Sequence, residues 1–431
     1  MLDIRFIREN AGLVAEKSKQ KGYEVNIDKL LAVDDSRRKL LSEIEKVRAE
    51  RNDLAERAKA GKPDGQSIEQ GKKLKESLAQ LEAQLQPVED EFTRLLKAVP
   101  NMPNDDVPVG ASEAENVVAK DWGDKPKFDF EPKTHWELAE SRGLIDKERA
   151  AKVSGSRFAY IKGDLVRLQL AIVQFVIDNL TSEETLKKIT QEAGLQNVSA
   201  KPFTPVLPPL MIRTEVFDAM DRLEPREDRY KVGTDDDNLW LQGSAEHTLG
   251  PMYMNETVDE KGLPLRFLGY ATSFRREAGT YGKDTEGIIR MHQFDKLEME
   301  SFTKPEDGLS EHLMMVAIQE YLLQQLKIPY RVLQKCTADI GKPNARGIDL
   351  EAWLPGAAKY METHTADYMT DYQARRLQTR IKDHGLVHTN DATAFALGRT
   401  MVAIIENYQK ADGTIEVPEV LRGYMRGQSL L

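Results

Sequence analysis

Residues 28–97 carry two heptad repeats separated by a short segment that favours helix termination. In both repeats the key positions alternate at spacings of four and three, which keeps them on one side of a helix. The second repeat consists of Leu74, Leu78, Leu81, Leu85, Val88, Phe92 and Leu95. The first repeat, which has one charged member, consists of Leu40, Ile44, Val47, Arg51, Leu54 and Ala58. The segment AGKPDGQS between them contains two glycines and a proline. The pattern therefore predicts an antiparallel coiled-coil hairpin.

The predicted hairpin has about 30 residues per helix, which at a rise of ~1.5 Å per residue gives an arm on the order of 45 Å. We expect an arm of this length to project, either as a spacer or dimerisation element, or as a lever that reaches a large partner. Basic residues concentrate near its tip and could meet phosphates: Arg48, Arg51, Arg57, Lys59, Lys62, Lys72, Lys73 and Lys75.

Charge is unevenly distributed along the chain. The net charge of the whole chain is −10, whereas residues 1–100 carry 20 Lys and Arg against 19 Asp and Glu. The N-terminal part is therefore less repulsive to a polyanion than the remainder. The segment PNMPNDDVPVG, residues 100–110, is rich in Pro, Asn and Asp and is typical of a linker. It predicts two domains, a helical hairpin over residues 1–105 and a second domain over residues 106–431.

Cysteine usage and hydropathy exclude several classes of protein. The single cysteine, Cys336, excludes an internal disulfide framework and a cysteine-rich zinc cluster, so we expect no structural zinc. The first residues, MLDIRFIREN, lack the apolar segment of a signal peptide. No stretch approaches 18 uninterrupted apolar residues. We therefore expect a cytoplasmic location and no membrane span.

The second domain contains both helix-like and strand-like hydrophobic patterns. The apolar segment 165–181 predicts a helix, and segments 265–275 and 290–300 predict two strands joined by a loop that contains Gly279, Gly282 and Gly287. A strand places alternate residues on one face. In the second strand one face would carry Arg290, His292, Phe294, Lys296 and Glu298, and the other Met291, Gln293, Leu297 and Met299. In the first strand Ser273, Arg275 and Glu277 would share a face.

Such a face is suited to a nucleotide. An arginine offers a planar fork for phosphate oxygens, an aromatic ring can stack on a base, and a carboxylate can accept from an exocyclic amine. The alternative interpretation is a solvated hairpin with cross-strand ion pairs, which are common and weak.

The hairpin also resembles a known motif. Phe274-Arg275-Arg276-Glu277, a variable loop, and Arg290 followed by Phe294 resemble the second signature motif of class II aminoacyl-tRNA synthetases. The fuller stretch EAGTYGKDTEGIIRMHQFDKLEM is similar to the seryl-tRNA synthetase family, of bacterial type.

The resemblance extends over nearly the whole chain. The helical hairpin resembles that family's tRNA-binding arm, and Pro209 in LPPLMIR matches the proline of the first motif, which lies at the dimer interface. GSAEHT, residues 243–248, resembles the Thr-Ala-Glu loop, with Ser244 in place of threonine. LGRTMVAIIENYQ, residues 397–409, resembles the third motif, and ADGTIEVPEVLRGYM, residues 411–425, resembles the family's C-terminal segment.

The resemblance implies an α+β fold, in which the helical arm precedes a mixed, mainly antiparallel sheet of six to seven strands flanked by helices. It implies an ATP site with Arg275 on the α-phosphate, Arg399 on the γ-phosphate, and these two arginines as the catalytic residues. Glu277 would read the adenine amino group and Phe294 would stack on the ring. Further ATP contacts implied by the resemblance are Arg276, Met291, Glu362, Thr363, His364 and Thr365, of which Glu362 and Thr365 would also hold Mg²⁺.

For the amino acid, the resemblance assigns L-serine to Ser244, Ala245, Glu246, Arg275, Glu298 and Thr393. A site that hydrogen-bonds a small hydroxyl rejects an analogue without it, because buried polar groups would be left unpaired. From the residues alone, other interpretations remain open: a strand glutamate is often an ion-pair partner, and Thr393 could be a helix cap.

Two segments depart from the family pattern. THTADY, residues 363–368, stands where familiar members have Ser-Ser-Cys-Ser-Asn, and residues 390–394, Asn-Asp-Ala-Thr-Ala, stand in place of Leu-Asn-Gly-Ser-Gly. Thr365 and Thr393 keep hydroxyl groups where the family uses them. We expect His364 to be a hydrogen-bonding residue behind the site, since no His or Cys lies at metal-ligand spacing nearby.

The resulting hypothesis is a homodimeric, ATP- and Mg²⁺-dependent enzyme that forms seryl-adenylate and transfers serine to serine tRNA. Charging of selenocysteine tRNA stays open. One alternative is an adenylate-forming amino acid ligase paralogue with another amino acid or acceptor, motivated by the two departures. Another is a non-catalytic scaffold that uses only the coiled coil.

Overall fold

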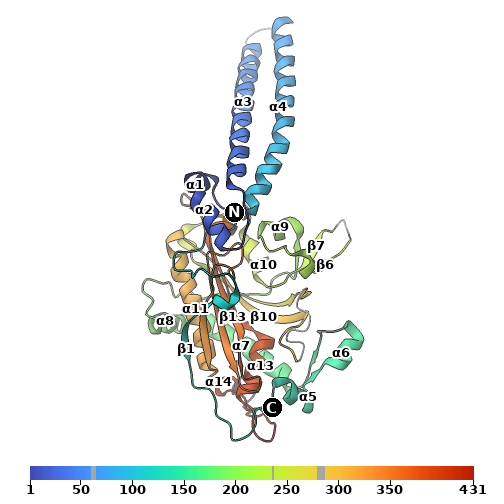
Figure 1. Cartoon of the computed structure of the whole chain (residues 1–431), viewed down its shortest axis with the longest axis vertical. Coiled ribbons are helices and arrows are strands. Elements are labelled where there is room, and N and C mark those ends of the chain that lie inside the picture. The colour runs from blue at the N-terminus through green and yellow to red at the C-terminus, as the bar shows by residue number, and fades with distance from the viewer. Residues whose placement is uncertain (60–64, 235–236, 279–286) are drawn as a thin grey trace. The chain divides into compact units, whose positions relative to one another are not determined.

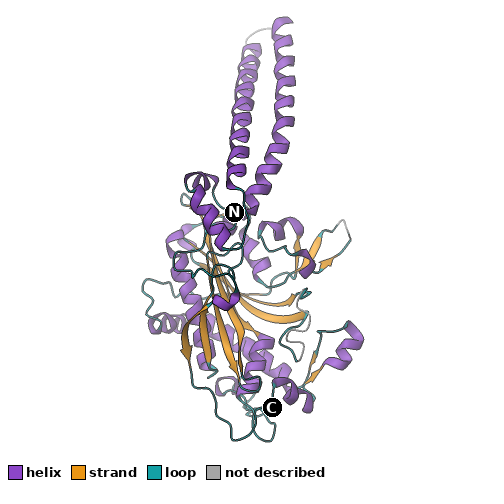
Figure 2. Cartoon of the chain, viewed as in Figure 1, coloured by secondary structure: helices purple, strands orange, loops and turns teal. Residues whose placement is uncertain are grey.

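The structure is a computed structural model that describes residues 1–59, 65–234, 237–278 and 287–431. Contacts divide the chain into two compact units, Met1–Met102 and Pro103–Leu431. The first unit is helical, and the second is built on a large sheet with helices against it (Figure 2).

The first unit contains four helices: α1 (Ile4–Glu9), α2 (Ala11–Gln20), α3 (Ile27–Lys59) and α4 (Gly65–Ala98). Helices α3 and α4 run side by side (Figure 1), which confirms the predicted hairpin. The apolar heptad positions that are described are buried or half-buried, and Leu78 and Phe92 are among the most buried. Arg51 is exposed, as a charge in the seam would be expected to be. Helix α4 begins at Gly65, inside the predicted breaker, whose residues 60–64 lie outside the described part of the chain.

Ion pairs link the two helices of the hairpin at its surface. Arg37 pairs with Glu89 and Arg48 with Glu82, each at 2.8 Å between the two helices. Several basic residues of the tip are exposed, and the side chains of Lys59 and Lys62 lie outside the description. Exposed pairs of this kind contribute little to stability, about 0–1 kcal/mol each, and exchange partners easily.

The sheet of the second unit has eight strands among the described residues. Its order is β1 (Val117–Trp122), β11 (Tyr330–Gln334), β12 (Arg346–Leu354), β13 (Lys359–Thr370), β16 (His388–Ala396), β10 (Gln293–Thr303), β9 (Leu265–Phe274) and β4 (Thr204–Val206). All neighbours are antiparallel except β4 and β9. The mixed, mainly antiparallel sheet is confirmed, and the expected six to seven strands are corrected to eight.

Smaller elements surround this sheet. Three small sheets join β5 (Met211–Arg213), β7 (Leu239–Leu241) and β6 (Lys231–Val232); β2 (Ile145–Asp146) and β3 (Tyr160–Ile161); and β15 (Gly385–Leu386), β14 (Arg380–Ile381) and β8 (Thr257–Val258). The short 3₁₀ turns are η1 (Glu113–Glu115), η2 (Arg226–Asp228), η3 (Gly250–Tyr253), η4 (Glu260–Gly262) and η5 (Pro305–Asp307).

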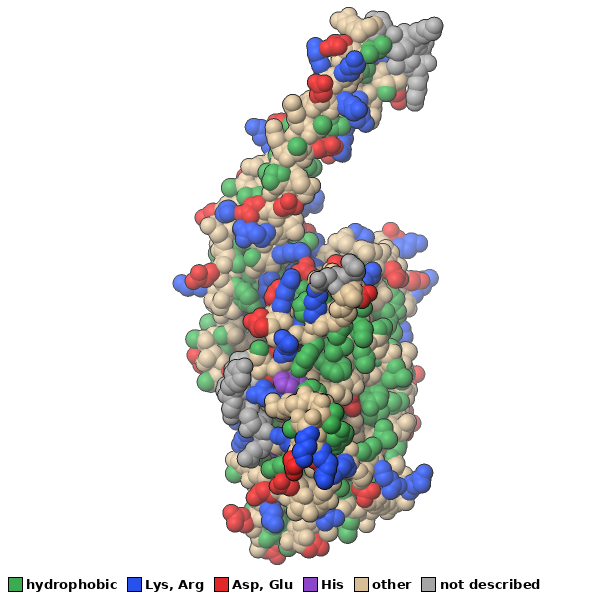
Figure 3. Space-filling view, turned by 90° about the vertical axis from the view of Figure 1, so that its right-hand side faces the viewer, with side chains coloured by type: hydrophobic (Ala, Val, Ile, Leu, Met, Phe, Trp, Pro, Cys, Tyr) green, Lys and Arg blue, Asp and Glu red, His purple; other side chains and the backbone are tan. Residues whose placement is uncertain are grey.

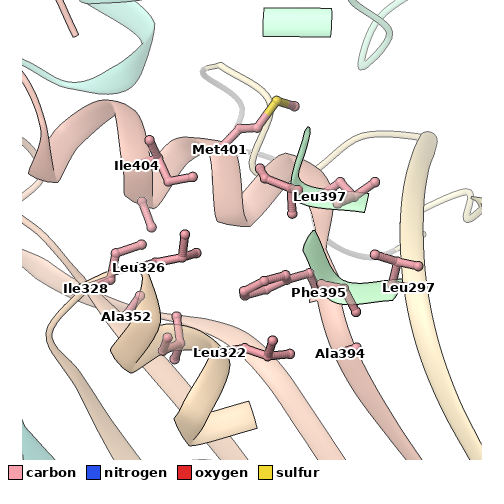
Figure 4. Close-up of a cluster of buried hydrophobic side chains, with 14 of the residues drawn as sticks. Leu297, Leu322, Leu326, Ile328, Ala352, Ala394, Phe395, Leu397, Met401 and Ile404 are labelled. Carbon is pink, nitrogen blue, oxygen red and sulfur yellow. The ribbon is translucent and has the colours of Figure 1, made fainter. Parts of the chain in front are cut away.

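The α-helices of the second unit are α5 (His135–Ser141), α6 (Lys147–Ser154), α7 (Asp164–Leu180), α8 (Glu183–Glu192), α9 (Thr214–Ala219), α10 (Glu246–Leu249), α11 (Gly308–Gln325), α12 (Tyr372–Leu377), α13 (Leu397–Asn407) and α14 (Glu419–Arg422). Helix α7 confirms the helix predicted over 165–181. Helix α13 packs Met401 and Ile404 against a core that includes Phe395 of β16 and Leu322 of α11 (Figure 4). This buried apolar layer fixes the position of α13 relative to the strands.

The predicted β-hairpin needs one correction. Strand β9 ends at Phe274 and β10 begins at Gln293, so Arg290 and His292 precede the strand. The backbone N–H of His292 donates to the carbonyl of Arg157 at 3.0 Å, a residue from a distant segment, which breaks the alternation predicted from residue 290. Gly279 and Gly282 of the predicted loop lie outside the description.

Among the helices that the structure describes, none is long and apolar enough to span a lipid bilayer.

Candidate active site

One cavity of about 260 Å³ in the second unit gathers many of the predicted site residues. Its walls come from the adjacent strands β10, β16 and β13, from the N-terminus of α13, and from the segments that flank β9 and β10. The lining residues are Asp228, Arg275, Glu277, Ile288, Ile289, Arg290, Met291, Phe294, Lys296, Glu362, Thr363, Thr365, Thr393, Ala396, Gly398 and Arg399. Strand order thus brings residues together that are more than a hundred positions apart in the sequence.

Arg275 follows β9 and is held from two sides. Its Nε donates to the carbonyl oxygen of Gly243 at 2.9 Å, and its guanidinium carbon lies 5.4 Å from the ring centre of Phe294. Both contacts fix the guanidinium, whose remaining N–H groups can serve as donors to an anion. An arginine fixed in this way is preorganised to bind a phosphate oxygen.

Arg399 lies in the first turn of α13, at the other side of the cavity. Its guanidinium donates to the carbonyl and carboxylate oxygens of Glu362, at 2.8 and 3.0 Å. Ala396 and Gly398 also line the cavity, so the N-terminal end of α13 lies against it. Helix N-termini attract anions through their free N–H groups and the helix dipole. Both features favour a polyphosphate here.

Glu277 and Arg290 form a close ion pair on the cavity wall. The backbone of Glu277 has a φ of +53°, a region that non-glycine residues seldom adopt. Met291 and Phe294 lie beside them and supply apolar and aromatic surface. Because Arg290 and Met291 both line the cavity, the predicted separation of these two residues onto opposite strand faces is wrong.

The loop predicted to bind serine lies directly behind Lys296. Lys296 lines the cavity, donates from Nζ to Ser244 Oγ at 3.0 Å, and pairs closely with Glu298. Ser244, Ala245, Glu246 and Glu298 are buried and are not among the residues that line the 260 Å³ cavity. Lys296 therefore stands between the cavity and this polar cluster, a role that sequence reasoning did not assign to it, although the period-two pattern placed it on the face of Phe294.

The two glutamates of this cluster have opposite pKa shifts. Burial raises the pKa of the Glu298 carboxyl to about 7, an effect that Lys296 partly offsets. Burial also acts on Glu246, but the positive charges of Lys296 and Arg222 act against it, and the pKa of Glu246 is lowered. Glu246 is therefore an anion at neutral pH, while Glu298 titrates near it.

A second acidic pair lies deeper, beyond Glu298 along β10. Glu300 and Asp391 are direct partners in the β10–β16 register, and Arg222 contacts Asp391 at 3.2 Å. Both carboxyl oxygens of Glu300 are buried without a hydrogen-bond partner among the described side chains and backbone. Burial raises the pKa of Glu300, and the neighbouring Asp391 raises it further. Burial also raises the pKa of Asp391, together with the carboxylates of Glu246 and Asp367 and against the charge of Arg222. Arg222 came from no sequence signal, because it reaches this pair only through the tertiary fold.

Three neighbouring groups fit a hard cation. Glu362 presents a carboxylate at the cavity, and Thr365 lines it with a hydroxyl oxygen that is buried and unpaired in the described structure. Asp349 pairs with Thr365 in the β12–β13 register, and burial raises the pKa of its carboxyl to about 7. Mg²⁺ prefers such oxygen ligands together with phosphate oxygens. The residues present therefore suit Mg²⁺ bound with a polyphosphate.

Three further residues predicted from the sequence lie where the prediction did not fully place them. His364 is buried, shares a hydrogen bond with Thr363 at 2.8 Å, and does not line the cavity, so an ATP contact through its side chain is not supported. Arg276 lines a neighbouring cavity instead. Thr393 is buried within β16 and is not a helix cap, which corrects that alternative.

Comparison with known proteins covers both units. Residues 1–103 match the seryl-tRNA synthetase N-terminal domain, and residues 230–408 match the class II core domain of tRNA synthetases for G, H, P, S and T. Over 437 residues the chain is 40% identical to the serine–tRNA ligase of Symbiobacterium thermophilum, with 99% of each chain covered. The chain belongs to the seryl-tRNA synthetase family. The serine–tRNA ligase of Petrotoga mobilis is likewise 40% identical, over 99% of each chain.

Solved structures of seryl-tRNA synthetases give the same picture. The enzyme from Pyrococcus horikoshii, complexed with ATP, superposes with a TM-score of 0.86 at 36% identity and covers 100% of this chain and 99% of its own. The cytoplasmic serine–tRNA ligase of Naegleria fowleri, in complex with AMP, has a TM-score of 0.84 at 27% identity, with coverages of 100% and 98%. The long helical hairpin and the eight-stranded sheet are thus the architecture of a seryl-tRNA synthetase.

Proposed function

We propose that this chain activates serine with ATP and transfers the seryl group to serine tRNA. The observation that carries the proposal is the convergence of Arg275, Arg399, Glu277 and Phe294 on one cavity. Two guanidinium groups, an aromatic face and a carboxylate are the groups that bind phosphates, a base and an exocyclic amine. Membership of the seryl-tRNA synthetase family supports the same reaction.

ATP would lie with its adenine on Phe294 and its amino group toward Glu277. Arg275 would then contact the α-phosphate and Arg399 the γ-phosphate, with Met291 and Thr363 beside them. Glu362 and Thr365 would hold Mg²⁺, which neutralises phosphate charge when bound. Because Arg399 already contacts Glu362 at 3.0 Å, the two groups lie close enough to serve one polyphosphate.

Adenylate formation needs positioning and charge stabilisation from these residues. The serine carboxylate attacks the α-phosphorus, and pyrophosphate leaves. Negative charge grows on the α-phosphate oxygens, next to the guanidinium that Gly243 and Phe294 hold in place. A preorganised donor of this kind lowers the barrier without moving during the reaction. In the second step a ribose hydroxyl of the tRNA end attacks the carbonyl carbon, and AMP leaves.

Serine would be recognised by the buried polar cluster next to Lys296. Glu246 is an anion at neutral pH and suits the ammonium group, whereas Glu298 and Thr393 suit the side-chain hydroxyl. Ser244 and Ala245 form the loop that carries Glu246, and Arg275 would meet the carboxylate. Glu298 and Thr393 are paired in the β10–β16 register, which puts both at one end of the site.

The two units would have separate functions, tRNA binding and aminoacylation. The hairpin α3–α4 in the first unit would bind tRNA, and the second unit would carry out aminoacylation. On the exposed surface of the hairpin, Arg48 pairs with the carboxylate of Glu82 and Lys73 with that of Glu69, and phosphates can replace these carboxylates at small cost. The division between Met102 and Pro103 supports this assignment.

We further propose a homodimer in the cytoplasm. The segment around Pro209 exposes apolar side chains: Leu207 is 80% exposed, Met211 51% and Leu210 38%. An exposed apolar segment is typical of an interface between subunits. The buried single cysteine, Cys336, is compatible with a reducing compartment.

Charging of total tRNA tests the function directly. The full chain should attach serine to tRNA in the presence of Mg²⁺ and ATP. Serine-dependent pyrophosphate exchange without any charging would instead support the adenylate-forming ligase, the alternative motivated by the departures at residues 363–368 and 390–394. Absence of both activities would contradict the proposed function.

A further inference from the structure

A buried histidine lies behind the proposed ATP site and does not line its cavity. His135 begins helix α5 and is 3% exposed, and Thr134 before it closes a capping box with Glu137. The backbone N–H of His135 donates to Glu406 Oε1 at 3.0 Å, and its ring Nδ1 lies 3.0 Å from the same oxygen. Because a carboxylate only accepts, Nδ1 is the donor. Two hydrogen bonds to one buried carboxylate fix the start of α5 and the orientation of the ring.

Glu406 also holds a third segment of the second unit. Its other carboxylate oxygen, Oε2, accepts from the backbone N–H groups of Gly356 and Ala357 at 3.0 and 3.2 Å. Gly356 packs closely against the segment that precedes α5, because a Cβ added to it would lie 2.1 Å from a carbonyl oxygen of that segment. Glu406 itself belongs to α13, whose first turn carries Arg399. The ring of His135 is therefore fixed relative to the helix that borders the ATP cavity.

The other edge of the ring faces Gly287, a glycine of the loop predicted from the sequence. The ring atom Nε2 is buried and has no hydrogen-bond partner among the described residues. A Cβ added to Gly287 would lie 1.8 Å from Nε2, and 2.7 and 2.8 Å from the two ring carbons bonded to it. Gly287 also has a φ of +63°, in the left-handed region. Any other residue type here would therefore collide with His135 and strain the backbone.

Gly287 leads directly into the wall of the ATP cavity. The next four residues, 288–291, all line this cavity. The same segment also approaches α13 directly, since the carbonyl oxygen of Ile288 lies 3.3 Å from the position of a Cβ on Gly398. Gly398 is in the first turn of α13 and lines the cavity as well. The segment is thus held at two points relative to this helix, by the ring edge and by the close approach to Gly398.

These contacts are internal. The face of the second unit that Figure 3 shows carries many charged side chains, whereas His135, Glu406 and Gly287 are buried. A close-packed interior transmits a displacement because it has little free space to absorb it. A shift at Gly287 would therefore move residues 288–291 in the ATP cavity. Misplacement of binding groups by about 1 Å can cost on the order of 10²-fold in rate.

We propose that His135 is a positioning residue for the ATP site. The edge of its ring, fixed by Glu406, sets the position of Gly287 and hence of residues 288–291 against the first turn of α13. The proposal rests on the function proposed above and assigns no substrate contact to His135. The residues proposed to bind serine lie outside the segment 287–291. The effect of the ring is therefore expected on ATP and not on serine.

Four variants test the proposal. In Gly287→Ala the new methyl group must displace the ring or the segment by about 1 Å or more to reach an ordinary contact distance. Gly143→Ala is the matched control, because Gly143 has a nearly equal φ of +65° and an added Cβ would meet no described atom within 4 Å. His135→Asn keeps a side-chain N–H for Glu406 but removes the ring edge. The double variant Gly287→Ala with His135→Asn gives the methyl group room.

Each variant is measured in three ways. Serine-dependent pyrophosphate exchange gives the KM of ATP and the KM of serine separately. Calorimetric titration with a non-hydrolysable ATP analogue gives a Kd that does not depend on turnover. Thermal unfolding shows whether each variant is folded.

The expected losses are confined to ATP. The KM of ATP and the Kd of the analogue should rise about tenfold in Gly287→Ala and about threefold in His135→Asn, while the KM of serine stays within about twofold. The double variant should recover most of the loss of Gly287→Ala, because the collision is relieved. Gly143→Ala should behave like the unmodified chain.

Several results would overturn the proposal: unchanged ATP constants in Gly287→Ala, an equal loss for serine, or additive losses in the double variant. If Gly287→Ala does not fold, a folded double variant that binds the analogue supports the proposal, and an unfolded one overturns it. Absence of exchange in the unmodified chain would instead contradict the proposed function, and the analogue titration would still test the role of His135.

Discussion

Arg275 and Arg399 line one cavity, although Arg275 follows strand β9 and Arg399 lies in the first turn of helix α13. Each guanidinium has its own support, Arg275 from the carbonyl of Gly243 and Arg399 from Glu362. The sheet order and the buried layer under α13 bring the two charges together. This convergence is the structural basis of the proposed adenylation chemistry.

Replacing Arg275 by alanine should slow pyrophosphate exchange by about 10²- to 10³-fold. Loss of one preorganised donor to developing charge costs on the order of 3–4 kcal/mol in other enzymes. The measurement is kcat/KM for serine-dependent exchange, with thermal unfolding as a check on folding. Arg380→Ala is the control, because Arg380 is exposed and lines neither cavity. Near-normal exchange in a folded Arg275→Ala variant would remove Arg275 from its assigned role.

Deleting residues 35–95 should leave exchange nearly intact and reduce tRNA charging by at least about 100-fold. The deletion removes most of α3 and α4 within the first unit, whereas the proposed adenylation residues all belong to the second. Exchange and charging assays on the same preparation separate the two effects. Normal charging by the shortened chain would show that the hairpin does not bind tRNA.

Salt dependence gives an independent check on the hairpin. Contacts between Lys or Arg and phosphate release counterions, so tRNA affinity should fall linearly on a log–log plot against salt concentration. A flat plot for the full-length chain would contradict phosphate contacts.

The serine KM should fall as pH rises from 6 to 8. Burial raises the pKa of Glu298 to about 7, so its ionised form, which accepts a hydrogen bond from the serine hydroxyl more strongly, gains population over this interval. A single titration at this pKa gives a change of about 5- to 10-fold. In Glu298→Gln the KM should be higher and should lose this pH dependence. If the unmodified chain and the variant had the same pH profile, Glu298 would not be the hydroxyl acceptor.

Glu406→Ala should destabilise the second unit by about 3–5 kcal/mol. Glu406 is fully buried in α13 and accepts from the backbone and ring nitrogens of His135 and from the backbone N–H groups of Gly356 and Ala357, all at 3.0–3.2 Å. Removing the acceptor leaves buried donors unpaired.

Urea unfolding measures this loss. Glu419→Ala is the control, because Glu419 is exposed and its pairing with Lys327 at 3.5 Å contributes little, within ~0.5 kcal/mol. A similar small change for Glu406→Ala would mean that this buried hydrogen-bond centre does not stabilise the fold.

The helices of the hairpin were predictable from the sequence because the spacing of their apolar residues directly reflects which side chains are buried. The four-three spacing around Leu78 and Phe92 specifies a seam between two helices, and the structure has that seam. The family resemblance located Arg275, Glu277, Phe294 and Arg399, and all four line one cavity.

Other features depended on contacts between distant segments and left no local signal. Strand β10 begins at Gln293 because the N–H of His292 is taken by Arg157. Arg222 contacts Asp391 only because the fold brings the two side chains to 3.2 Å. The rings of Phe158, Tyr230 and His292, which line the cavity beside Arg276, likewise come from three separate segments, so no single stretch of sequence indicates this group.

Pyrophosphate exchange by the full chain, measured with each of the twenty amino acids in the presence of Mg²⁺ and ATP, shows whether the chain activates serine. We expect exchange that depends on serine and falls to background with the other nineteen, including alanine, which lacks the hydroxyl. Exchange driven by a different amino acid, or by none, would contradict this expectation.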